Sequence, residues 1–404
     1  MHFQFTPISD MIILMYIERK SSIVLDRLKK SFPIVAITGP RQSGKTTLAK
    51  HKFSNYEYVS LENPNVLDFA NEDPISFLNQ FKDGVIIDEI QKVPELFSYL
   101  QEMADDAKEM GKIVLTGSSQ FTLRSGISQS LAGRIGYLEL LPLSISELKK
   151  NKDLDEQMST GFYPALYDRK IAPNDWYANY IRTYVERDVN QLINIKDNSK
   201  FRLFLKLCAG RTGQLVNLSN LGNEVGVSHT TINEWISILE ISYITFRLPP
   251  HFQNFSKRLV KSSKIYFYDV GLLCWLLGIK SGKELSVYPL RGQIFENLIV
   301  ADAYKYFFNI GEQPSLYFWR DNKGLEVDLL CERKNKLHPI EIKSGATILS
   351  DMFKNIKKWK ELSGDLGGEL RLIYGGNKQQ QRTDIEILPW FSVDEIFSTF
   401  DSEI

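Results

Sequence analysis

The segment at residues 39–47 is the clearest candidate for chemistry in this sequence. It matches the pattern G-x-x-x-x-G-K-[ST], directly after an apolar run and ahead of a helical one. Glycines at both ends let the backbone wrap a phosphate with its N–H groups, and a helix N-terminus adds partial positive charge. We expect Lys45 to reach the β- and γ-phosphates of a nucleotide and Thr46 to hold Mg²⁺. The predicted nucleotide-binding residues are Gly39, Pro40, Arg41, Gln42, Ser43, Gly44, Lys45, Thr46 and Thr47, together with Asp88 and Ser118.

Two adjacent carboxylates, Asp88 and Glu89, follow the apolar run at 85–87. Such a run predicts a buried strand, and ligands of open α/β sheets bind beyond the carboxyl ends of the strands. We expect Asp88 to bind Mg²⁺ through water and Glu89 to orient and polarise the attacking water. An isolated Asp-Glu pair is more often a solvated turn, but downstream of a phosphate loop the catalytic interpretation is favoured.

Polar groups near two further apolar runs extend this candidate site. Thr116, Ser118 and Ser119 come at or after the run at 113–116, where a hydroxyl can touch the γ-phosphate; a plain serine-rich turn is the alternative. Arg134 comes just before the last predicted strand of this region. An arginine there either crosses a subunit boundary to stabilise the transferring phosphoryl group or lies on the surface, and the sequence leaves both open.

A second set of charged residues lies near the C-terminus. Glu341 and Lys343 leave the same face of one predicted strand, because strand periodicity is two, and Asp328 on the neighbouring strand of a hairpin meets Glu341. Glu296 lies on the preceding helix. Close carboxylates ask for a divalent cation. We predict Glu296, Asp328 and Glu341 as metal ligands, with Lys343 orienting or deprotonating a water that attacks a phosphodiester.

The first set of motifs resembles the AAA-type ATPases of bacteria and archaea, in the branch that carries a C-terminal domain of unknown function. The matching segments read Gly-Pro-Arg-Gln at 39–42, Asp-Glu-Ile-Gln at 88–91, Leu-Thr-Gly-Ser-Ser at 115–119, Leu-Ala-Gly-Arg at 131–134 and Tyr-Ile-Arg-Thr-Tyr-Val-Glu-Arg-Asp at 180–188. The resemblance implies ATP and Mg²⁺ as cofactors, ATP hydrolysis, self-assembly and a helical lid at about 146–210. Glu186, Arg187 and Asp188 form either an ion pair within the helix or a lid contact to the nucleotide.

The second set resembles the PD-(D/E)xK nuclease fold, in the order of a helix glutamate, a strand aspartate and Glu-x-Lys on the next strand. Val327 stands where the pattern has proline, a change that these loose motifs tolerate. The resemblance implies a restriction-endonuclease-like α/β domain. Such folds either cleave nucleic acid or keep the site for binding alone, and the sequence does not choose between these roles.

The expected fold class is α/β. Alternating β-branched and helical runs predict a P-loop ATPase core with a parallel sheet at 1–145, followed by the helical lid at 146–210. Two short helices joined at Gly226 and followed by a strand predict a winged helix-turn-helix at 211–256. A nuclease-like α/β domain is expected at 257–404. Basic clusters at 257–264 and 354–360 outline a candidate phosphate track in this last region.

Composition limits the remaining choices. The 404 residues carry 49 Lys and Arg against 49 Asp and Glu, which excludes coating of nucleic acid by bulk charge but leaves local patches open. Three widely spaced cysteines indicate neither a disulfide framework nor a zinc site, and no apolar run is long enough to span a membrane, so we expect a cytoplasmic protein. The leading hypothesis is an ATPase that acts on DNA, with homo-oligomers expected. The alternatives are a docking platform that does not cleave and an ATP-driven oligomeric switch.

Overall fold

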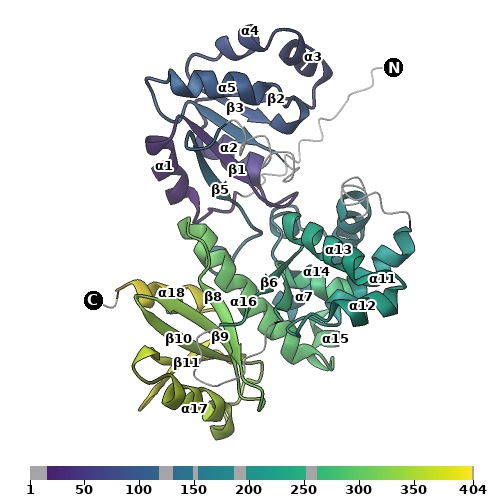
Figure 1. Ribbon diagram of the computed structural model, residues 1–404, viewed down its shortest axis with the longest axis vertical. Helices are drawn as coiled ribbons and strands as arrows, with labels where there is room; N and C mark the ends of the chain where they lie inside the picture. The colour runs from purple at the N-terminus through teal and green to yellow at the C-terminus, as the bar shows by residue number, and fades with distance from the viewer. Residues whose placement is uncertain (1–15, 118–130, 149–152, 186–196, 252–261, 403–404) are drawn as a thin grey trace, which may run out of the picture.

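The structure is a computed structural model that describes residues 16–117, 131–148, 153–185, 197–251 and 262–402. Figure 1 shows three parts: an N-terminal unit at the top (residues 16–148), a middle unit at the lower right (153–286) and a C-terminal unit at the lower left (291–402). Helix α16 (Arg291–Ile310) runs between the last two units. Its end meets helix α1 (Ser22–Ser31), where the Arg27 guanidinium donates to the Ile310 carbonyl at 3.2 Å.

The N-terminal unit is built on a five-stranded parallel sheet in the order β2-β3-β4-β1-β5, which confirms the predicted parallel sheet. The strands are β1 (Ile34–Thr38), β2 (Glu57–Ser60), β3 (Val85–Asp88), β4 (Ile113–Thr116) and β5 (Ile135–Glu139). Besides α1, the helices around the sheet are α2 (Lys45–Lys52), α3 (Pro64–Glu72), α4 (Pro74–Asn79), the short η1 (Ile90–Lys92) and α5 (Leu96–Asp105).

The central strands of this sheet are apolar on both faces because helices cover both sides. Along β1, Ile34 and Ala36 join one hydrophobic cluster, while Val35 and Ile37 join another on the opposite face. Strands β3 and β4 are likewise buried at every position. A strand buried on both faces cannot shift its register without exposing apolar surface, so the carboxyl ends of β1, β3 and β4 are held in line.

The middle unit is mainly helical and contains one β-hairpin. The short η2 (Ile145–Glu147), at the end of the N-terminal unit, leads into it. Its own helices are α7 (Leu154–Thr160), α8 (Ala165–Asp168), α9 (Pro173–Tyr180), the π-helix η3 (Ile181–Val185), α11 (Asn198–Ala209), α12 (Leu218–Val225), α13 (His229–Ile241), α14 (Val270–Leu276) and α15 (Gly282–Ser286). The antiparallel hairpin joins β6 (Thr245–Leu248) and β7 (Lys264–Phe267). As predicted, α12 and α13 are two short helices joined at Gly226, whose φ is 75°.

The C-terminal unit is a six-stranded mixed sheet in the order β12-β13-β11-β10-β9-β8. Strands β10, β11 and β13 are parallel, and the other pairings are antiparallel, including the predicted β9–β10 hairpin. The strands are β8 (Leu316–Arg320), β9 (Glu326–Arg333), β10 (Lys336–Lys343), β11 (Leu370–Tyr374), β12 (Gln380–Arg382) and β13 (Ile385–Pro389). The helices besides α16 are η4 (Ser350–Phe353), α17 (Lys354–Ser363), η5 (Gly364–Leu366) and α18 (Val393–Ser402).

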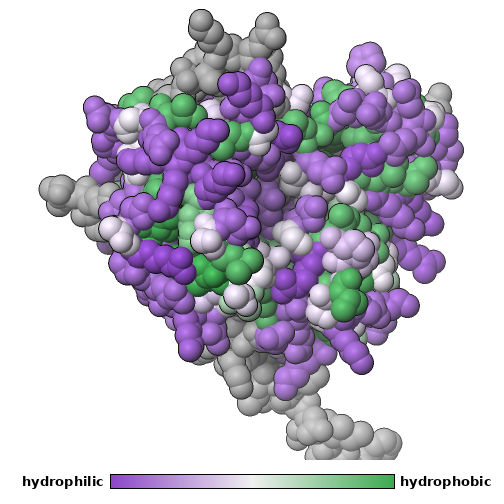
Figure 2. Space-filling view, turned by 90° about the horizontal axis from the view of Figure 1, so that it is seen from below, coloured by the Kyte–Doolittle hydropathy of each residue, from purple (hydrophilic) through white to green (hydrophobic). Residues whose placement is uncertain are grey.

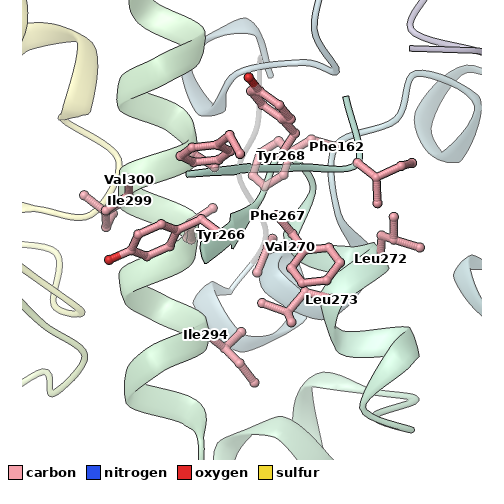
Figure 3. Close-up of a cluster of buried hydrophobic side chains, with 14 of the residues drawn as sticks. Phe162, Tyr266, Phe267, Tyr268, Val270, Leu272, Leu273, Ile294, Ile299 and Val300 are labelled. Carbon is pink, nitrogen blue, oxygen red and sulfur yellow. The ribbon is translucent and has the colours of Figure 1, made fainter. Parts of the chain in front are cut away.

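One hydrophobic cluster joins the middle and C-terminal units. Figure 3 shows Phe267 of β7 and Leu273 of α14 beside Ile294, Ile299 and Val300 of α16, all buried in this cluster. The α16 side chains therefore complete the core of the hairpin as well as that of their own sheet. Residues near β7 are consequently fixed relative to α16.

The surface and the cysteines agree with the composition. In the view of Figure 2, hydrophilic side chains predominate and hydrophobic ones appear in smaller separate areas. Within the part of the chain that the structure describes, no helix is both long and apolar enough to cross a membrane. Cys208, Cys274 and Cys331 are buried, and none of the three forms a disulfide.

Candidate functional site

The loop between β1 and α2 has the backbone that a phosphate cradle requires. Gly39 and Gly44 have φ values of 138° and 95°, and Gln42 between them has a φ of 61°. A Cβ atom on Gly39 would lie 2.1 Å from the Leu140 carbonyl oxygen, so any side chain there would strike the backbone after β5. The loop therefore depends on glycine both for its left-handed turns and for its close approach to the neighbouring strand.

Lys45 lies inside this loop. Its ammonium donates to the carbonyl oxygens of Gly39 at 2.9 Å and Pro40 at 2.7 Å, and the side chain is buried. Burial lowers the pKa of Lys45 to about 8, although the carboxylates of Glu89 and Asp88 act in the opposite direction. A phosphate entering the loop would supply the negative charge that this buried ammonium lacks.

Asp88 gathers three hydroxyl groups at the carboxyl end of β3. Its Oδ2 accepts from Thr46 Oγ1 at 3.0 Å and from the Tyr58 hydroxyl at 2.9 Å, and its Oδ1 accepts from Thr116. The sheet register explains the last contact, since Asp88 pairs directly with Thr116 of β4. The predicted Thr46 and Asp88 are thus brought together, and Thr116 lies beside them; its predicted contact with the γ-phosphate stays a prediction.

Tyr58 was missed by the sequence reasoning. It lies on β2 two residues before Ser60, which pairs with Asp88, so its ring reaches the carboxylate from the neighbouring strand. Burial and the contact with Asp88 raise the pKa of Tyr58 to about 12. The Lys50 ammonium lies 3.4 Å from the centre of its ring. An exposed tyrosine on a short strand carries no motif, and only the strand order would have pointed to it.

The oxygen donors at this point fit Mg²⁺. Thr46 Oγ1 and the Asp88 carboxylate lie next to each other at the mouth of the loop, and hard oxygen ligands are those that Mg²⁺ prefers. Glu89 follows with a φ of 57°, which is rare for a residue with a side chain. It accepts a hydrogen bond from the Gln91 amide. The backbone thus turns sharply at the residue predicted to orient water.

The other predicted residues of this site are placed less centrally. Gln42 accepts a hydrogen bond from the Trp176 indole at 3.1 Å, the Arg41 guanidinium lies 5.6 Å from the Tyr184 ring, and Thr47 is exposed on α2. The loop therefore touches helix α9 and the π-helix that follows it. Five predicted residues lie outside the described part of the chain: Ser118, Ser119, Glu186, Arg187 and Asp188.

Arg134 lies at the amino ends of the strands, whereas the phosphate loop lies at their carboxyl ends. The register pairs Ile135 with Ile34 at the start of β1, whereas the loop follows the other end of β1 at Thr38. The Arg134 guanidinium makes a bidentate ion pair with Asp105 at the end of α5, at 2.5 and 3.0 Å. Arg134 therefore cannot serve the phosphate loop of its own subunit, and its role in trans stays a prediction.

A buried arginine that the sequence reasoning also missed connects the phosphate loop to the entry of the middle unit. Arg19 donates to the Ser43 carbonyl at 2.9 Å, to the Leu141 carbonyl at 2.7 Å and to Glu147 Oε1 at 3.0 Å. The Glu147 side chain is fully buried and also accepts from the backbone N–H groups of Lys20 and Ser144, both at 2.8 Å. One ion pair thus fixes the loop, the N-terminal segment and η2.

The same entry segment is held by the C-terminal unit from its other side. The Ile145 N–H donates to Asp302 of α16 at 2.8 Å, and the Lys305 ammonium donates to the Leu143 carbonyl at 2.9 Å. The pKa of Asp302 is raised from its ordinary value of 3.8 to about 7. Burial is the main cause, and the carboxylates of Asp394 on α18 and Glu147 add to it, while the Lys305 ammonium acts in the opposite direction. The segment at 141–147 therefore contacts both the phosphate loop region and α16.

The predicted carboxylates of the C-terminal unit lie close together, but lysines lie among them. Glu341 Oε1 contacts the Lys343 ammonium at 2.6 Å, and Asp328 Oδ2 lies 3.4 Å from the same ammonium and accepts from the Ile342 N–H at 2.8 Å. Burial and the neighbouring Asp328 raise the pKa of Glu341 to about 8. The predicted strand geometry of Glu341 and Lys343 is confirmed.

Glu296, the third predicted ligand, faces Lys264 of β7. The Lys264 ammonium lies 3.0 Å from Glu296 Oε1 and 2.6 Å from Oε1 of Glu326, a carboxylate that was not among the predicted ligands. The Tyr266 hydroxyl donates to Glu296 Oε1 as well. Burial acts to lower the pKa of Lys264, but Glu296 and Glu326 outweigh it and raise the pKa.

A divalent metal does not fit this arrangement. Among the described residues no group of three His, Cys, Asp or Glu side chains is placed to hold a metal ion. The predicted set Glu296, Asp328 and Glu341 is instead divided between two ammonium groups. Lys264, which the sequence placed in an exposed basic cluster, is only 3% exposed, so that part of the expected phosphate track is wrong. The rest of that cluster, at 257–261, lies outside the described residues.

A cavity of about 790 Å³ opens at the carboxyl ends of β10, β11 and β13. Two basic side chains, Lys378 and Arg382, line it together with Trp390 and Phe391, whose ring centres lie 5.6 Å apart. Phe391 is 38% exposed although it is a large aromatic residue. Asp153 of the middle unit also borders the cavity. Basic and aromatic side chains thus meet where ligands of α/β sheets bind.

Comparison with known proteins supports an AAA-type ATPase domain in the N-terminal unit. Residues 31–149 match a family described as an AAA domain, and residues 151–283 and 291–393 match two domains of unknown function, DUF8612 and DUF4143. A Walker-type ATPase of Pyrococcus abyssi covers 64% of this chain and 94% of its own, with 13% identity and a TM-score of 0.38, a similarity too weak to carry an argument.

Two curated relatives extend over most of the chain, and both are uncharacterized. MJ1544 of Methanocaldococcus jannaschii is 25% identical over 340 residues, covering 75% of this chain and 73% of that protein. Rv2008c of Mycobacterium tuberculosis is 30% identical over 336 residues, covering 82% of this chain and 75% of that protein. With an AAA-type P-loop ATPase domain followed by a DUF4143 domain, the chain belongs to the same family as Rv2008c.

Proposed function

We propose that this protein hydrolyses ATP at the loop between β1 and α2. The observation that carries the proposal is the meeting of Thr46 and Thr116 at Asp88, with the strained Glu89 directly after it. This arrangement provides a phosphate cradle, oxygen donors for a cation and a carboxylate for water at one edge of one sheet. A loop that bound phosphate only for structural reasons would not need a carboxylate in a left-handed conformation beside it.

Each residue has a distinct part in the proposed reaction. The backbone N–H groups of the loop bind the phosphates, and Lys45 leaves the carbonyls of Gly39 and Pro40 to neutralise them. Thr46 and Asp88 hold Mg²⁺, which when bound offsets charge on the phosphate oxygens. Glu89 orients the attacking water and polarises it towards the γ-phosphate.

Two variants and one control test this assignment. Lys45→Ala is expected to abolish binding of a fluorescent ATP analogue, whereas Glu89→Gln keeps binding and loses turnover by a factor of 100 or more, on the order of 3 kcal/mol of transition-state stabilisation. Glu95→Gln, an exposed carboxylate at the start of α5, is the matched control and keeps both. Unchanged turnover in Glu89→Gln would refute the assignment.

We further propose that nucleotide binding is transmitted to the other two units, which makes the protein an ATP-driven switch. The Arg19 and Glu147 ion pair supports this, because it connects the Ser43 carbonyl of the loop to the segment that Asp302 holds from α16. Assembly into homo-oligomers, with Arg134 reaching a neighbour, belongs to the same proposal. Arg134→Ala is then expected to lower turnover without weakening nucleotide binding, and turnover per subunit should rise with protein concentration.

DNA is the partner we propose for the cavity of the C-terminal unit. Lys378 and Arg382 can neutralise backbone phosphates, and Phe391 offers a ring on which a base can stack. The exposed polar side chains of His229, Thr230 and Asn233 at the start of α13 are a second candidate contact, to base edges through the proposed winged helix. DNA binding at either surface would rest on these local side chains, because the net charge of the whole protein is zero.

Fluorescence anisotropy with labelled single-stranded and duplex DNA tests this part. Replacing Lys378 and Arg382 together by glutamine should weaken binding and reduce the slope of log affinity against log salt by about 1 for each lost phosphate contact. Lys283→Gln on the exposed face of α15 is the control and should leave the slope unchanged. Equal affinity and slope in all three proteins would contradict a DNA site in this cavity. We propose DNA binding without metal-dependent cleavage, because the Lys264 ammonium contacts Glu296, one of the three expected metal ligands.

A further inference from the structure

We propose that the Lys264 ammonium takes the place of a divalent metal ion in the carboxylate cluster of the C-terminal unit. The cluster comprises the four acidic side chains that face Lys264 and Lys343 where α16, β9 and β10 meet: Glu296, Glu326, Asp328 and Glu341. In this form the unit binds its partners without cutting them, and a single lysine from the middle unit determines that outcome.

The contacts of the ammonium are those of a resident cation. Lys264 Nζ lies 2.6 Å from Glu326 and 3.0 Å from Glu296, so it bridges a strand and a helix of the C-terminal unit. The Phe318 ring centre lies 5.3 Å away and adds an aromatic face on another side. A divalent ion bound by the same oxygens would lie within a few ångströms of this positive charge, which strongly disfavours both being present.

The backbone of Lys264 is held on both sides. Lys264 is the first residue of β7, where it pairs with Leu248 on one side and forms a bridge with Leu215 on the other. Three residues later, the Asn297 amide of α16 exchanges two hydrogen bonds with the backbone of Phe267, at 2.8 and 2.9 Å. Lys264 and Glu296 are therefore positioned by the same strand-to-helix contact.

The side chains that follow Lys264 along β7 contact α16 or are buried. In Figure 3 Tyr266 extends past α16 with its hydroxyl directed away from the hydrophobic cluster, and that hydroxyl donates to Glu296. Ile265 and Phe267 are buried. Lys264 itself is only 3% exposed, and it lies where β7 and α16 contribute to one hydrophobic cluster.

Glu341, another member of the cluster, is incompletely hydrogen-bonded. Glu341 is 2% exposed, and its Oε2 atom has no hydrogen-bond partner among the described residues. Its other oxygen is bound by Lys343, so the buried carboxylate is only partly satisfied. Removing the Lys264 ammonium would leave the carboxylates of Glu296 and Glu326 without the cation that they share, and we expect Mg²⁺ or Mn²⁺, which prefer such oxygen ligands, to replace it.

The test is a Mn²⁺ titration of the full-length protein without nucleotide, following free Mn²⁺ by electron paramagnetic resonance. Lys264→Ala is expected to bind one Mn²⁺ more than the wild type, and Lys264→Ala with Glu296→Gln should lose that additional ion. Lys283→Ala, at an exposed lysine of α15, should bind the same number of ions as the wild type. A folded Lys264→Ala protein with no additional ion would overturn the proposal.

A second comparison decides the matter if Lys264→Ala does not fold. Wild type and Glu341→Gln should bind equal numbers of Mn²⁺ ions, because the wild-type cluster is expected to hold none. One ion bound by the wild type and absent in Glu341→Gln would show that a metal already occupies the cluster and would overturn the proposal. Neither readout depends on ATP turnover, so failure of the proposed ATPase function would be seen separately.

Discussion

Replacement of Arg19 by methionine should loosen the phosphate loop and the segment at 141–147 together. The side chain is 4% exposed and makes three hydrogen bonds, to the carboxylate of Glu147 and to the carbonyls of Ser43 and Leu141. Removing one partner of a buried ion pair costs about 3–5 kcal/mol, because the remaining charge stays buried. Glu147 keeps two backbone N–H donors, so we expect the lower end, about 3 kcal/mol.

Hydrogen exchange measured by mass spectrometry can locate this effect. A local loss of about 3 kcal/mol corresponds to a roughly hundredfold faster exchange of the amides that open through this contact. Peptides covering 39–48 and 141–148 should show it, while peptides from the C-terminal sheet should not. Arg27→Met removes an exposed arginine contact to Ile310 and serves as the control. Unchanged exchange in both peptides would refute the view that Arg19 connects the loop to the middle unit.

Three further substitutions test other contacts. Asp302→Asn should change how the free energy of unfolding depends on pH. The raised pKa of Asp302 means that its carboxyl binds a proton more tightly in the folded protein than in the unfolded chain. The stabilisation by this proton is therefore present below about pH 4 and is lost as the pH rises to about 7. Asparagine should remove this pH-dependent change in the free energy of unfolding, which is at most about 4 kcal/mol and can be measured by urea titrations at several pH values. The same pH dependence in wild type and variant would contradict the assignment. Gly39→Ala should abolish binding of a fluorescent ATP analogue, because its Cβ meets a backbone oxygen at 2.1 Å; retained binding would show that the loop can shift. Tyr58→Phe should lower kcat about fivefold with little change in KM, since the lost hydroxyl positions Asp88 at a cost of about 1 kcal/mol, and equal kcat values would exclude that role.

Local patterns were sufficient for the phosphate site. Glycine spacing and the apolar runs at 34–38, 85–88 and 113–116 determine the strands, and the bounds of β1, β3 and β4 agree with those runs. A parallel sheet then brings the ends of β3 and β4 together, which is why Thr46, Asp88 and Thr116 meet as expected. For this site, the sequence motif and the strand order of the parallel sheet both place the same residues together.

Contacts between distant segments could not be predicted in this way. Neither the pair Arg19 and Glu147 nor the pair Lys264 and Glu296 belongs to a sequence motif. Each pair forms only because distant segments of the chain pack against each other. Within the helical lid expected at 146–210, α9 ends at Tyr180 and a π-helix follows, a change of winding that periodicity does not reveal. Strand β12 was missed because its residues are exposed and polar, so no apolar alternation marks it.

Helix α16 has a mechanical consequence for the molecule. It is 20 residues long, about 30 Å, and an α-helix resists compression along its axis. Asp302 and Glu296 lie about 9 Å apart on this rod, one beside the segment held by Arg19 and the other beside Lys264. If Asp302 moves along the helix axis, Glu296 should move by the same distance. Spin labels at the two ends of α16 should therefore keep a constant separation through the nucleotide cycle, even while their distances to β3 change.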